Sequence, residues 1–223
     1  MTEIALYDLD KTITKRPTYL YFLLHAARRH APWRQLLLPA IGLTSIGYLV
    51  GLVGRARLKE INQAIMIGPA IDAARLAEIC ESFAERAMTG DVYPQAQARI
   101  AADRARGRRL VLASASYAFY VLPIARHLGF DDVVATASRR DEEGRVLARI
   151  DGENCYGTAK LRMIEAWAAD YAPIRGAIHV RFHSDSESDL PVFEWSDERI
   201  AVNPTAKLRK LAEERGWPII AWG

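Results

Sequence analysis

From residue 94 onward, short apolar runs alternate with helical segments, and no other feature of the sequence constrains the fold as strongly. The apolar runs predict buried strands at 108–114, 132–138, 177–184 and 199–203. Helices are predicted between and beside them, at 94–106, 117–130, 157–171, 188–196 and 205–216. The stretch RRDEEGRVLARI predicts a hairpin that turns at Glu143 and Gly144. Strands that alternate with helices form parallel sheets with right-handed crossovers, so we expect an α/β protein with a doubly wound, Rossmann-like parallel sheet.

The beginning of the chain departs from this alternation. Residues 3–8 predict one more buried strand, but residues 17 to about 90 then look helical throughout, as in the stretch IDAARLAEICESFAERA. A helical block of this length after a single strand indicates an insertion. We therefore expect a core made of residues 1–14 and 91–223, with an all-helical cap inserted at residues 15–90.

Composition narrows the function classes and the compartment. Charged residues make up 26% of the 223 residues, which argues against disorder, and a net charge of +3 is too weak to indicate a nucleic-acid partner. Cys80 and Cys155 form no CxxC motif, so we expect free thiols in a reducing compartment. No secretory signal is predicted, because Asp8 and Asp10 fall where its apolar segment would lie. These features together predict a cytoplasmic protein.

Polar side chains follow three of the predicted strands at their carboxyl ends, where open parallel sheets bind ligands: Asp8, Asp10, Ser114, Asp185 and Asp189. Lys160 lies near the start of a predicted helix, from which it can reach the same edge. Crowded carboxylates repel one another unless a divalent cation neutralises them, and their hard oxygen atoms favour Mg²⁺. Lysine and serine suit phosphate oxygens, and a carboxylate can attack phosphorus to form an aspartyl-phosphate. A second carboxylate two residues further on can protonate the leaving oxygen and then activate water.

Four short stretches carry a resemblance to a known family. DLDKT, at 8–12, resembles the first motif (DxDxT) of the haloacid dehalogenase (HAD) superfamily, and VLASAS, at 111–116, resembles its second. Lys160 in NCYGTAK resembles the third motif, and HSDSESDLP, at 183–191, resembles the fourth. The order and spacing are similar to those of the phosphoserine-phosphatase-like subfamily IB, whose helical cap is inserted between the first two motifs. The resemblance covers essentially the whole chain.

The resemblance implies catalytic and phosphate-binding roles. Asp8 would be the nucleophile, and Asp10 would be the general acid and base. Thr12 would support the loop and the phosphate site by hydrogen bonding. Ser114 and Lys160 would hold the phosphoryl group during its transfer.

The resemblance also implies a Mg²⁺ cofactor. Asp8 would bind the ion through its carboxylate, and Asp10 through its backbone carbonyl. Asp185 would bind it directly. Asp189 would bind it through water or orient the site.

Residues just after the first motif bear on the substrate. Lys11 stands where phosphatases of this group often have a small residue, and Lys15 and Arg16 follow it. Phosphoserine phosphatases of this fold carry a glutamate shortly after the first motif, and the matching place here is Pro17. No acidic residue lies between positions 10 and 60. We therefore expect the three cations to select an acidic, lipidic phosphomonoester, in a layout that resembles the phosphatidylglycerophosphatase C type.

An uncharged run, QLLLPAIGLTSIGYLVGLVG, occupies residues 35–54 of the predicted cap. It is about long enough to span a bilayer, but a single crossing would separate Asp8 from Ser114. Three interpretations stay open: a buried spine of the cap or a dimer contact, a bend at Pro39 that dips into one leaflet, and an apolar face at the membrane interface. Flanking cations favour contact between residues 34–59 and an anionic membrane.

The residues and the resemblance together predict a Mg²⁺-dependent phosphomonoester hydrolase that works through an aspartyl-phosphate. We expect it to act on an anionic lipid phosphate such as phosphatidylglycerophosphate, in peripheral contact with the inner face of the membrane. The first alternative is a soluble phosphatase for phosphoserine or another small phosphate. The second is a non-catalytic module that binds a membrane or a partner. The oligomeric state stays open.

Overall fold

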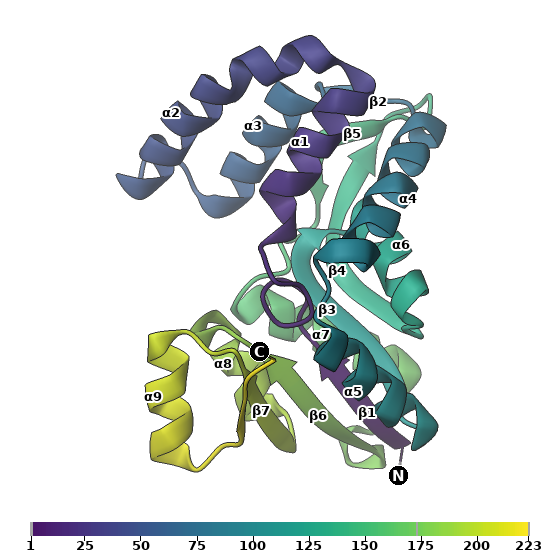
Figure 1. The fold of residues 1–223 in the computed structure, drawn as a ribbon, viewed down its shortest axis with the longest axis vertical. Coiled ribbons are helices and arrows are strands. Elements are labelled where there is room, and N and C mark those ends of the chain that lie inside the picture. The colour runs from purple at the N-terminus through teal and green to yellow at the C-terminus, as the bar shows by residue number, and fades with distance from the viewer. Residues whose placement is uncertain (1, 173, 223) are drawn as a thin grey trace.

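A computed structural model describes residues 2–172 and 174–222, which form one eight-stranded sheet in the order β2-β5-β4-β3-β1-β6-β7-β8 (Figure 1). All pairings from β4 through β8 along this order are parallel, whereas β5 runs antiparallel to β4 and to β2. The strands are β1 (Thr2–Tyr7), β2 (Ala70–Ile71), β3 (Arg109–Tyr117), β4 (Asp132–Arg140), β5 (Val146–Asp151), β6 (Ile178–Ser184), β7 (Glu198–Val202) and β8 (Ile219–Ile220). The predicted α/β fold with a Rossmann-like sheet is confirmed.

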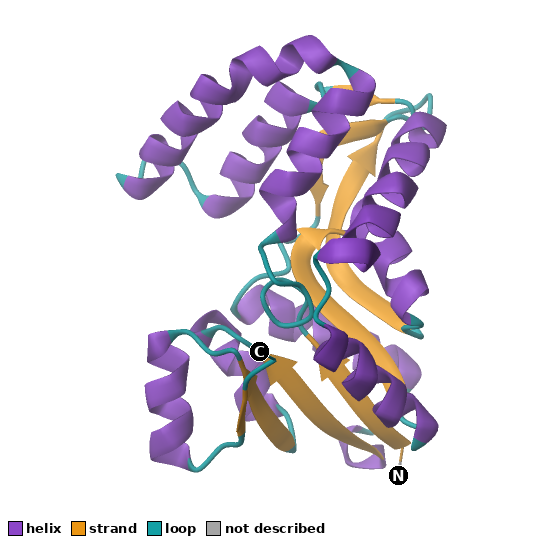
Figure 2. Ribbon diagram, in the orientation of Figure 1, coloured by secondary structure: helices purple, strands orange, loops and turns teal. Residues whose placement is uncertain are grey.

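Helices flank the sheet and extend beyond one end of it (Figure 2). The α-helices are α1 (Thr18–His30), α2 (Leu38–Leu49), α3 (Arg55–Met66), α4 (Ala73–Gly90), α5 (Pro94–Ala105), α6 (Ala118–Leu128), α7 (Thr158–Tyr171), α8 (Leu190–Trp195) and α9 (Ala206–Arg215). Short 3₁₀ helices are η1 (Pro32–Leu37), η2 (Arg175–Ala177) and η3 (Glu187–Asp189). Gly129, which ends α6, has φ of 76°, a left-handed conformation that glycine adopts without strain.

The central strand β1 is buried on both faces of the sheet. Ala5 and Tyr7 belong to a core that includes side chains from α1, α4, α5 and α6. Ile4 and Leu6 point the other way and pack with side chains from α7, α8 and α9. Successive residues of a strand face opposite sides, so one continuous apolar run can serve two layers of helices. The carboxyl end of β1 therefore emerges at the middle of the sheet.

The segment between β1 and β3 contains α1 to α5 and one strand that the sequence did not predict. The two-residue strand β2 pairs with β5 and extends the sheet at one edge. Helix α4 packs beside α6, where the rings of Phe83 and Tyr120 lie 5.8 Å apart. Helices α1, α2 and α3 stand together beyond the carboxyl end of β1 (Figure 1). These helices are placed to cover that edge of the sheet.

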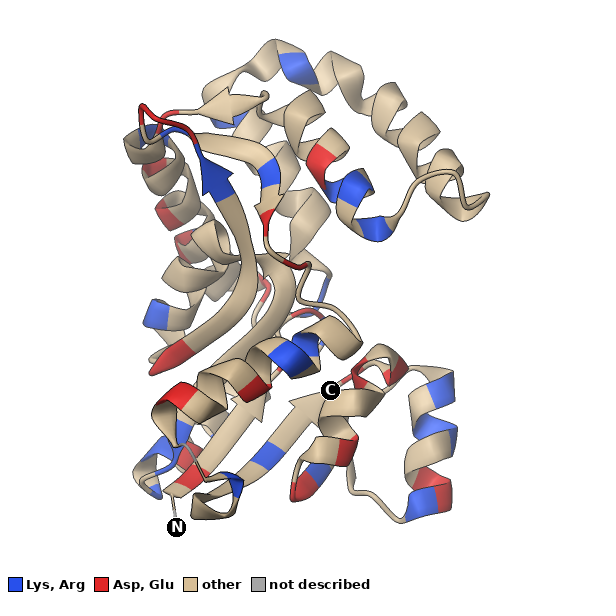
Figure 3. Ribbon diagram, turned by 180° about the vertical axis from the view of Figure 1, so that it is seen from behind, with Lys and Arg blue, Asp and Glu red and all other residues tan. Residues whose placement is uncertain are grey.

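The uncharged run, residues 35–54, forms the end of η1, all of α2 and the turn after it, and most of it faces outward. Ile41 is the one buried residue of α2, whereas Leu43 is 70% exposed and Leu49 is 79% exposed. Further exposed side chains on this segment and its flanks are Trp33, Leu36, Leu38, Ile46, Val50 and Leu52. Figure 3 shows no charged residue along α2. The interpretation of this run as a buried spine is therefore not what the structure shows.

Within residues 2–172 and 174–222, no helix combines the length and the apolar character that a transmembrane span needs.

A buried acid on α5 links β1 to the arginines around it. Asp103 of α5 is fully buried and accepts hydrogen bonds from the Tyr7 hydroxyl at 2.5 Å and from Arg108 Nη1 at 2.7 Å. Arg99 and Arg181 lie 3.3 and 3.4 Å from the same carboxylate. Burial favours protonation of Asp103, but the hydrogen bonds from Tyr7 and Arg108 outweigh it and hold its pKa below the usual range. The ionised carboxylate is thus the counter-charge for a cluster of arginines.

We predict that Asp103→Asn lowers the free energy of unfolding by about 3 kcal/mol, because arginines at the edge of the core lose their counter-charge. The control is Glu81→Gln, which removes the surface partner of Arg126 and His127 and should cost less than about 1 kcal/mol. Urea unfolding of both variants measures the difference. Equal stability of the two variants would contradict this interpretation of the cluster.

Candidate active site

The loop after β1 positions the two aspartates of the first motif. The backbone N–H of Asp8 donates to the His183 carbonyl at 2.9 Å, which continues the pairing of β1 with β6 by one residue. The chain then turns sharply, and Lys11 has φ of 61°, in the left-handed region. This region is uncommon for a residue with a long side chain, so Lys11 marks a constrained turn. Thr12 Oγ1 lies 3.5 Å from Asp8 Oδ2, on the inner side of the turn.

Lys160 joins two carboxylates that are far apart in the chain. Its Nζ donates to Asp8 Oδ1 at 2.8 Å and to Asp189 Oδ2 at 2.7 Å, and all three side chains are buried. Lys160 lies in the first turn of α7, and Asp189 ends η3 after β6. Burial alone would lower the pKa of Lys160, but the two carboxylates raise it above its usual value. The lysine is therefore a permanent cation at the carboxyl ends of β1 and β6.

The acidic residues nearby remain short of positive charge. Burial raises the pKa of Asp8 well above its ordinary value, and Asp189, Asp185 and Asp10 raise it further against the opposing effect of Lys160. Burial, followed by the charge of Asp189, raises the pKa of Asp185 to about 7. Asp189 also accepts a hydrogen bond from Ser184 Oγ at 2.8 Å. A further cation at this edge would relieve the repulsion.

Asp8 and Asp185 have the chemistry of a Mg²⁺ site. The described residues hold no cluster of three or more His, Cys, Asp or Glu side chains arranged around a common ion position. Mg²⁺ is commonly held by one or two carboxylates, with waters and phosphate oxygens completing its octahedral shell. Two carboxylates whose ionised forms are disfavoured by burial and by mutual repulsion fit that pattern.

Asp10 points away from this cluster and toward the inserted helices. Its Oδ1 accepts from the backbone N–H of Thr18 at 2.6 Å, and its Oδ2 accepts from Ser116 Oγ at 2.9 Å. The backbone N–H of Ser116 donates in turn to Ser114 Oγ at 3.1 Å. Ser116 was not singled out from the sequence. The VLASAS stretch contains it, but only the extension of β3 to Tyr117 shows that it faces Asp10.

A pocket of about 360 Å³ opens between Asp10 and the inserted helices. Its wall combines core residues with apolar and basic side chains from α1, α2 and α3, including Asp10, Ser116, Leu20, Ile41, Arg55 and Lys59. Lys59 was seen in the sequence only as a cation flanking the apolar run. In the structure Lys59 shares a buried face of α3 with Asn62, Gln63 and Met66, and the helical spacing of these four positions is the signal that could have placed it there.

The cations after the first motif lie at different places. Lys11 is exposed, and its charge lowers the pKa of Asp185, so it lies at the rim of the acidic cluster. Lys15 Nζ donates to the Gly90 carbonyl at 2.9 Å. Arg16 lies 3.9 Å from Asp91. Lys15 and Arg16 are thus engaged at the end of α4 and are not among the residues that line the pocket beside Asp10.

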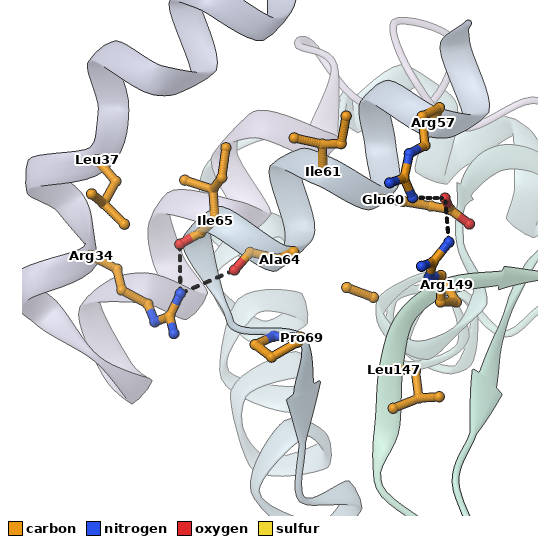
Figure 4. Close-up of a pocket in the computed structure, with 11 residues that line it drawn as sticks. Arg34, Leu37, Arg57, Glu60, Ile61, Ala64, Ile65, Pro69, Leu147 and Arg149 are labelled. Carbon is orange, nitrogen blue, oxygen red and sulfur yellow. Dashed lines mark hydrogen bonds and ion pairs between the residues drawn. The ribbon is translucent and has the colours of Figure 1, made fainter. Parts of the chain in front are cut away.

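A second, larger pocket of about 550 Å³ lies between η1, α3 and β5 (Figure 4). Arg34 donates there to the carbonyls of Ala64 and Ile65 at 3.0 and 2.8 Å. Glu60 lies between Arg57 and Arg149, at 3.0 and 3.9 Å. The charged groups of this pocket thus already have partners within the protein, and the residues of the four motifs do not line it.

Comparison with known proteins agrees with this geometry. A model of the family described as "haloacid dehalogenase-like hydrolase" matches residues 5–194. The chain belongs to the haloacid dehalogenase-like hydrolase family. A Mycobacterium tuberculosis (strain ATCC 25618 / H37Rv) protein named as a probable phosphatase is 31% identical over 98% of this HAD chain and 75% of its own length. The prediction of a HAD-family hydrolase is therefore confirmed. Its relatives include proteins that are named as phosphatases.

Solved structures show the same fold. A Bordetella pertussis Tohama I protein of unknown function superposes with a TM-score of 0.88 at 26% identity, with both chains fully covered. A phosphoserine phosphatase, described as a phospho-aspartyl intermediate analogue, superposes with a TM-score of 0.66 at 15% identity over 100% of this chain and 94% of its own. At that identity the second similarity concerns the HAD fold alone.

We predict that Lys160→Met lowers the free energy of unfolding by about 3–5 kcal/mol at pH 7.5 in EDTA, because two buried carboxylates lose their shared cation. The loss should shrink at pH 5. Without the lysine the pKa of Asp8 rises further, so acidification protonates Asp8 and removes the repulsion between the two acids. Urea unfolding at the two pH values measures this.

The control for that variant is Lys207→Met. Lys207 is exposed and lies 3.9 Å from Glu187, so its loss should change stability by less than about 0.5 kcal/mol at either pH. A Lys160→Met protein that matched this control at both pH values would show that the buried ion cluster does not stabilise the fold.

Proposed function

We propose that this HAD-family hydrolase is a Mg²⁺-dependent phosphatase of phosphomonoesters that works through an aspartyl-phosphate. The observation that carries the proposal is the buried contact of Lys160 with Asp8 and Asp189. A lysine held against a carboxylate in this way can bind a phosphoryl group while that carboxylate attacks it. Ser114 lies on the adjacent strand β3, two residues beyond the position that pairs with Tyr7 at the end of β1, where a second phosphate ligand would be needed.

Asp8 and Asp10 divide the chemistry between them. Asp8 attacks phosphorus, and the leaving alkoxide takes a proton from Asp10. Asp10 then removes a proton from water, which attacks the aspartyl-phosphate and releases inorganic phosphate and free Asp8. The hydrogen bonds from Thr18 and Ser116 hold the Asp10 carboxyl toward the pocket in which the leaving group would lie.

The remaining motif residues bind the phosphoryl group and orient the side chains around it. Ser114, Lys160 and Thr12 hold the phosphoryl oxygens and the loop that carries Asp8. Asp189, bonded to both Lys160 and Ser184, keeps the lysine in position.

Asp8 and Asp185, with the Asp10 backbone carbonyl, would hold the Mg²⁺ ion. When bound, the ion neutralises the carboxylates and the phosphoryl oxygens and thereby favours attack.

We propose that residues 15–90 act as a cap on a core of residues 1–14 and 91–223. The cap would select the leaving group and exclude water from the aspartyl-phosphate until the alcohol has left. The pocket wall supports this, because residues of α1, α2 and α3 face core residues across it. The arrangement also favours placement in the phosphoserine-phosphatase-like subfamily IB.

For the substrate we propose an anionic lipid phosphate, such as phosphatidylglycerophosphate, at a peripheral site on the inner face of the membrane. The exposed apolar residues of α2 and the absence of acidic residues between positions 10 and 60 support this choice. A soluble phosphatase for phosphoserine or another small phosphate is the alternative, and the modest size of the pocket favours it. A non-catalytic binding module ranks last, because every motif residue is present.

We predict that Asp8→Asn lowers turnover of p-nitrophenyl phosphate with Mg²⁺ by more than about 10³-fold, because the amide cannot attack phosphorus. Its circular dichroism spectrum should match that of the unmodified protein. Asp170→Asn, at an exposed aspartate on α7, is the matched control and should keep full activity. Substantial turnover by the Asp8 variant would remove it as the nucleophile.

We also predict that the protein co-sediments with vesicles containing about 30% anionic lipid and binds neutral vesicles less well, because each nearby cation contributes about 1 kcal/mol. Leu43→Glu with Leu49→Glu should weaken this binding by at least about tenfold. Ile174→Glu is the control, since Ile174 is also exposed but lies before β6. Unchanged vesicle binding by the double variant would contradict membrane contact. If the double variant instead abolished self-association, the run would be a dimer contact.

A further inference from the structure

Helix α3 sends one lysine into the pocket beside Asp10. Lys59 is only 8% exposed, and its Nζ donates to the Ala115 carbonyl at 2.6 Å and to Asn154 Oδ1 at 2.7 Å. Thr136 Oγ1 lies at 3.3 Å, and the Tyr117 ring centroid lies 4.3 Å away. None of these partners is a carboxylate. The groups that contact Lys59 Nζ are therefore all neutral, and the charged residues near it are Asp10 and Arg55 of the same pocket wall.

This environment is poor for an ammonium group. A buried charge is costly unless an opposite charge compensates it, and burial lowers the pKa of Lys59 to about 7. Lys160 shows the contrast, because its two carboxylates raise its pKa despite complete burial. No negatively charged group contacts Lys59 Nζ among the described residues, and a bound ligand can supply one.

The pocket wall indicates where that charge would lie. Lys59 and Asp10 line the same pocket, so a molecule whose phosphoryl group meets Asp8 extends its leaving group toward Lys59. Arg55, one turn earlier on α3, lines the same pocket and lies 4.0 Å from the Tyr156 ring centroid. Tyr19 donates its hydroxyl to the Lys59 carbonyl at 2.7 Å and fixes this part of the helix. The basic end of the pocket thus faces the acid that protonates the leaving group.

We propose that Lys59 determines specificity by binding a second anionic group on the leaving-group side of the substrate. The substrates would then be phosphomonoesters that carry another negative charge. This inference rests on the proposed phosphatase activity. The second anion is either the carboxylate of a small phosphate or the phosphodiester of a lipid headgroup, and both present the acceptor oxygens that an ammonium group binds.

The test measures binding without turnover, in the Asp8→Asn background with Mg²⁺. Calorimetry compares 3-phosphoglycerate with glycerol 3-phosphate, which has a hydroxymethyl group in place of the carboxylate. A second pair compares short-chain phosphatidylglycerophosphate with a monoalkyl phosphate of similar apolar length. We expect at least about tenfold tighter binding of the doubly anionic member in one pair, and loss of that preference on Lys59→Met.

The matched control is Arg57→Met, on the same helix but outside this pocket, where Arg57 pairs with Glu60 at 3.0 Å. It should keep the preference. A Lys59-dependent preference in the soluble pair alone assigns the second anion to a carboxylate, and one in the lipid pair alone assigns it to the phosphodiester. No preference in either pair, or a preference that survives Lys59→Met, overturns the proposal.

Failure of the Lys59 proposal can be distinguished from failure of the phosphatase proposal. If the unmodified protein bound these ligands with a Lys59-dependent preference but did not hydrolyse them, the phosphatase proposal would fail while the anion site stood. If it hydrolysed both members of each pair equally well and Lys59→Met only lowered the melting temperature, Lys59 would be a brace between α3 and the sheet, and this inference would be wrong.

Discussion

The structure of the site depends on one buried contact, in which Lys160 holds Asp8 and Asp189 on either side of its ammonium group. The three residues come from the ends of β1 and η3 and from the first turn of α7, so the contact forms only when the central sheet is assembled. One lysine does not balance the acids around it, and Asp185 and Asp10 leave an excess of negative charge. That excess is the physical reason why we propose a divalent cation at this edge, and the lysine is the reason why we propose a phosphoryl ligand.

The motif residues could be predicted because parallel strands end at a common edge. Asp8, Ser114 and Asp185 each follow an apolar run, so their convergence needs only the order of the strands and no detail of packing. Ser116 and Lys59 could not be found in this way. The first depends on how far β3 continues, and the second on the face that α3 turns toward the core. The strands β2 and β8 are each two residues long and carry too little pattern to detect.

The inserted helices reverse the usual distribution of polarity. Helix α2 exposes leucine and isoleucine, whereas α3 buries Lys59, Asn62 and Gln63. A helix that served only to pack would have its apolar side inward and its polar side outward. Here the inward polar side lines the pocket next to Asp10, and the outward apolar side is available for contact. Both features support our proposal that the inserted helices select the substrate and that the bond-breaking groups lie at the edge of the sheet.

The most direct test of the account is a crystal structure of the protein with Mg²⁺ and beryllium fluoride, which mimics a phosphoryl group bonded to a carboxylate. We expect BeF₃⁻ on a carboxylate oxygen of Asp8, with Lys160 and Ser114 bonded to its fluorines and Mg²⁺ between Asp8 and Asp185. Beryllium fluoride bound to another residue, or Mg²⁺ held away from Asp185, would contradict the account.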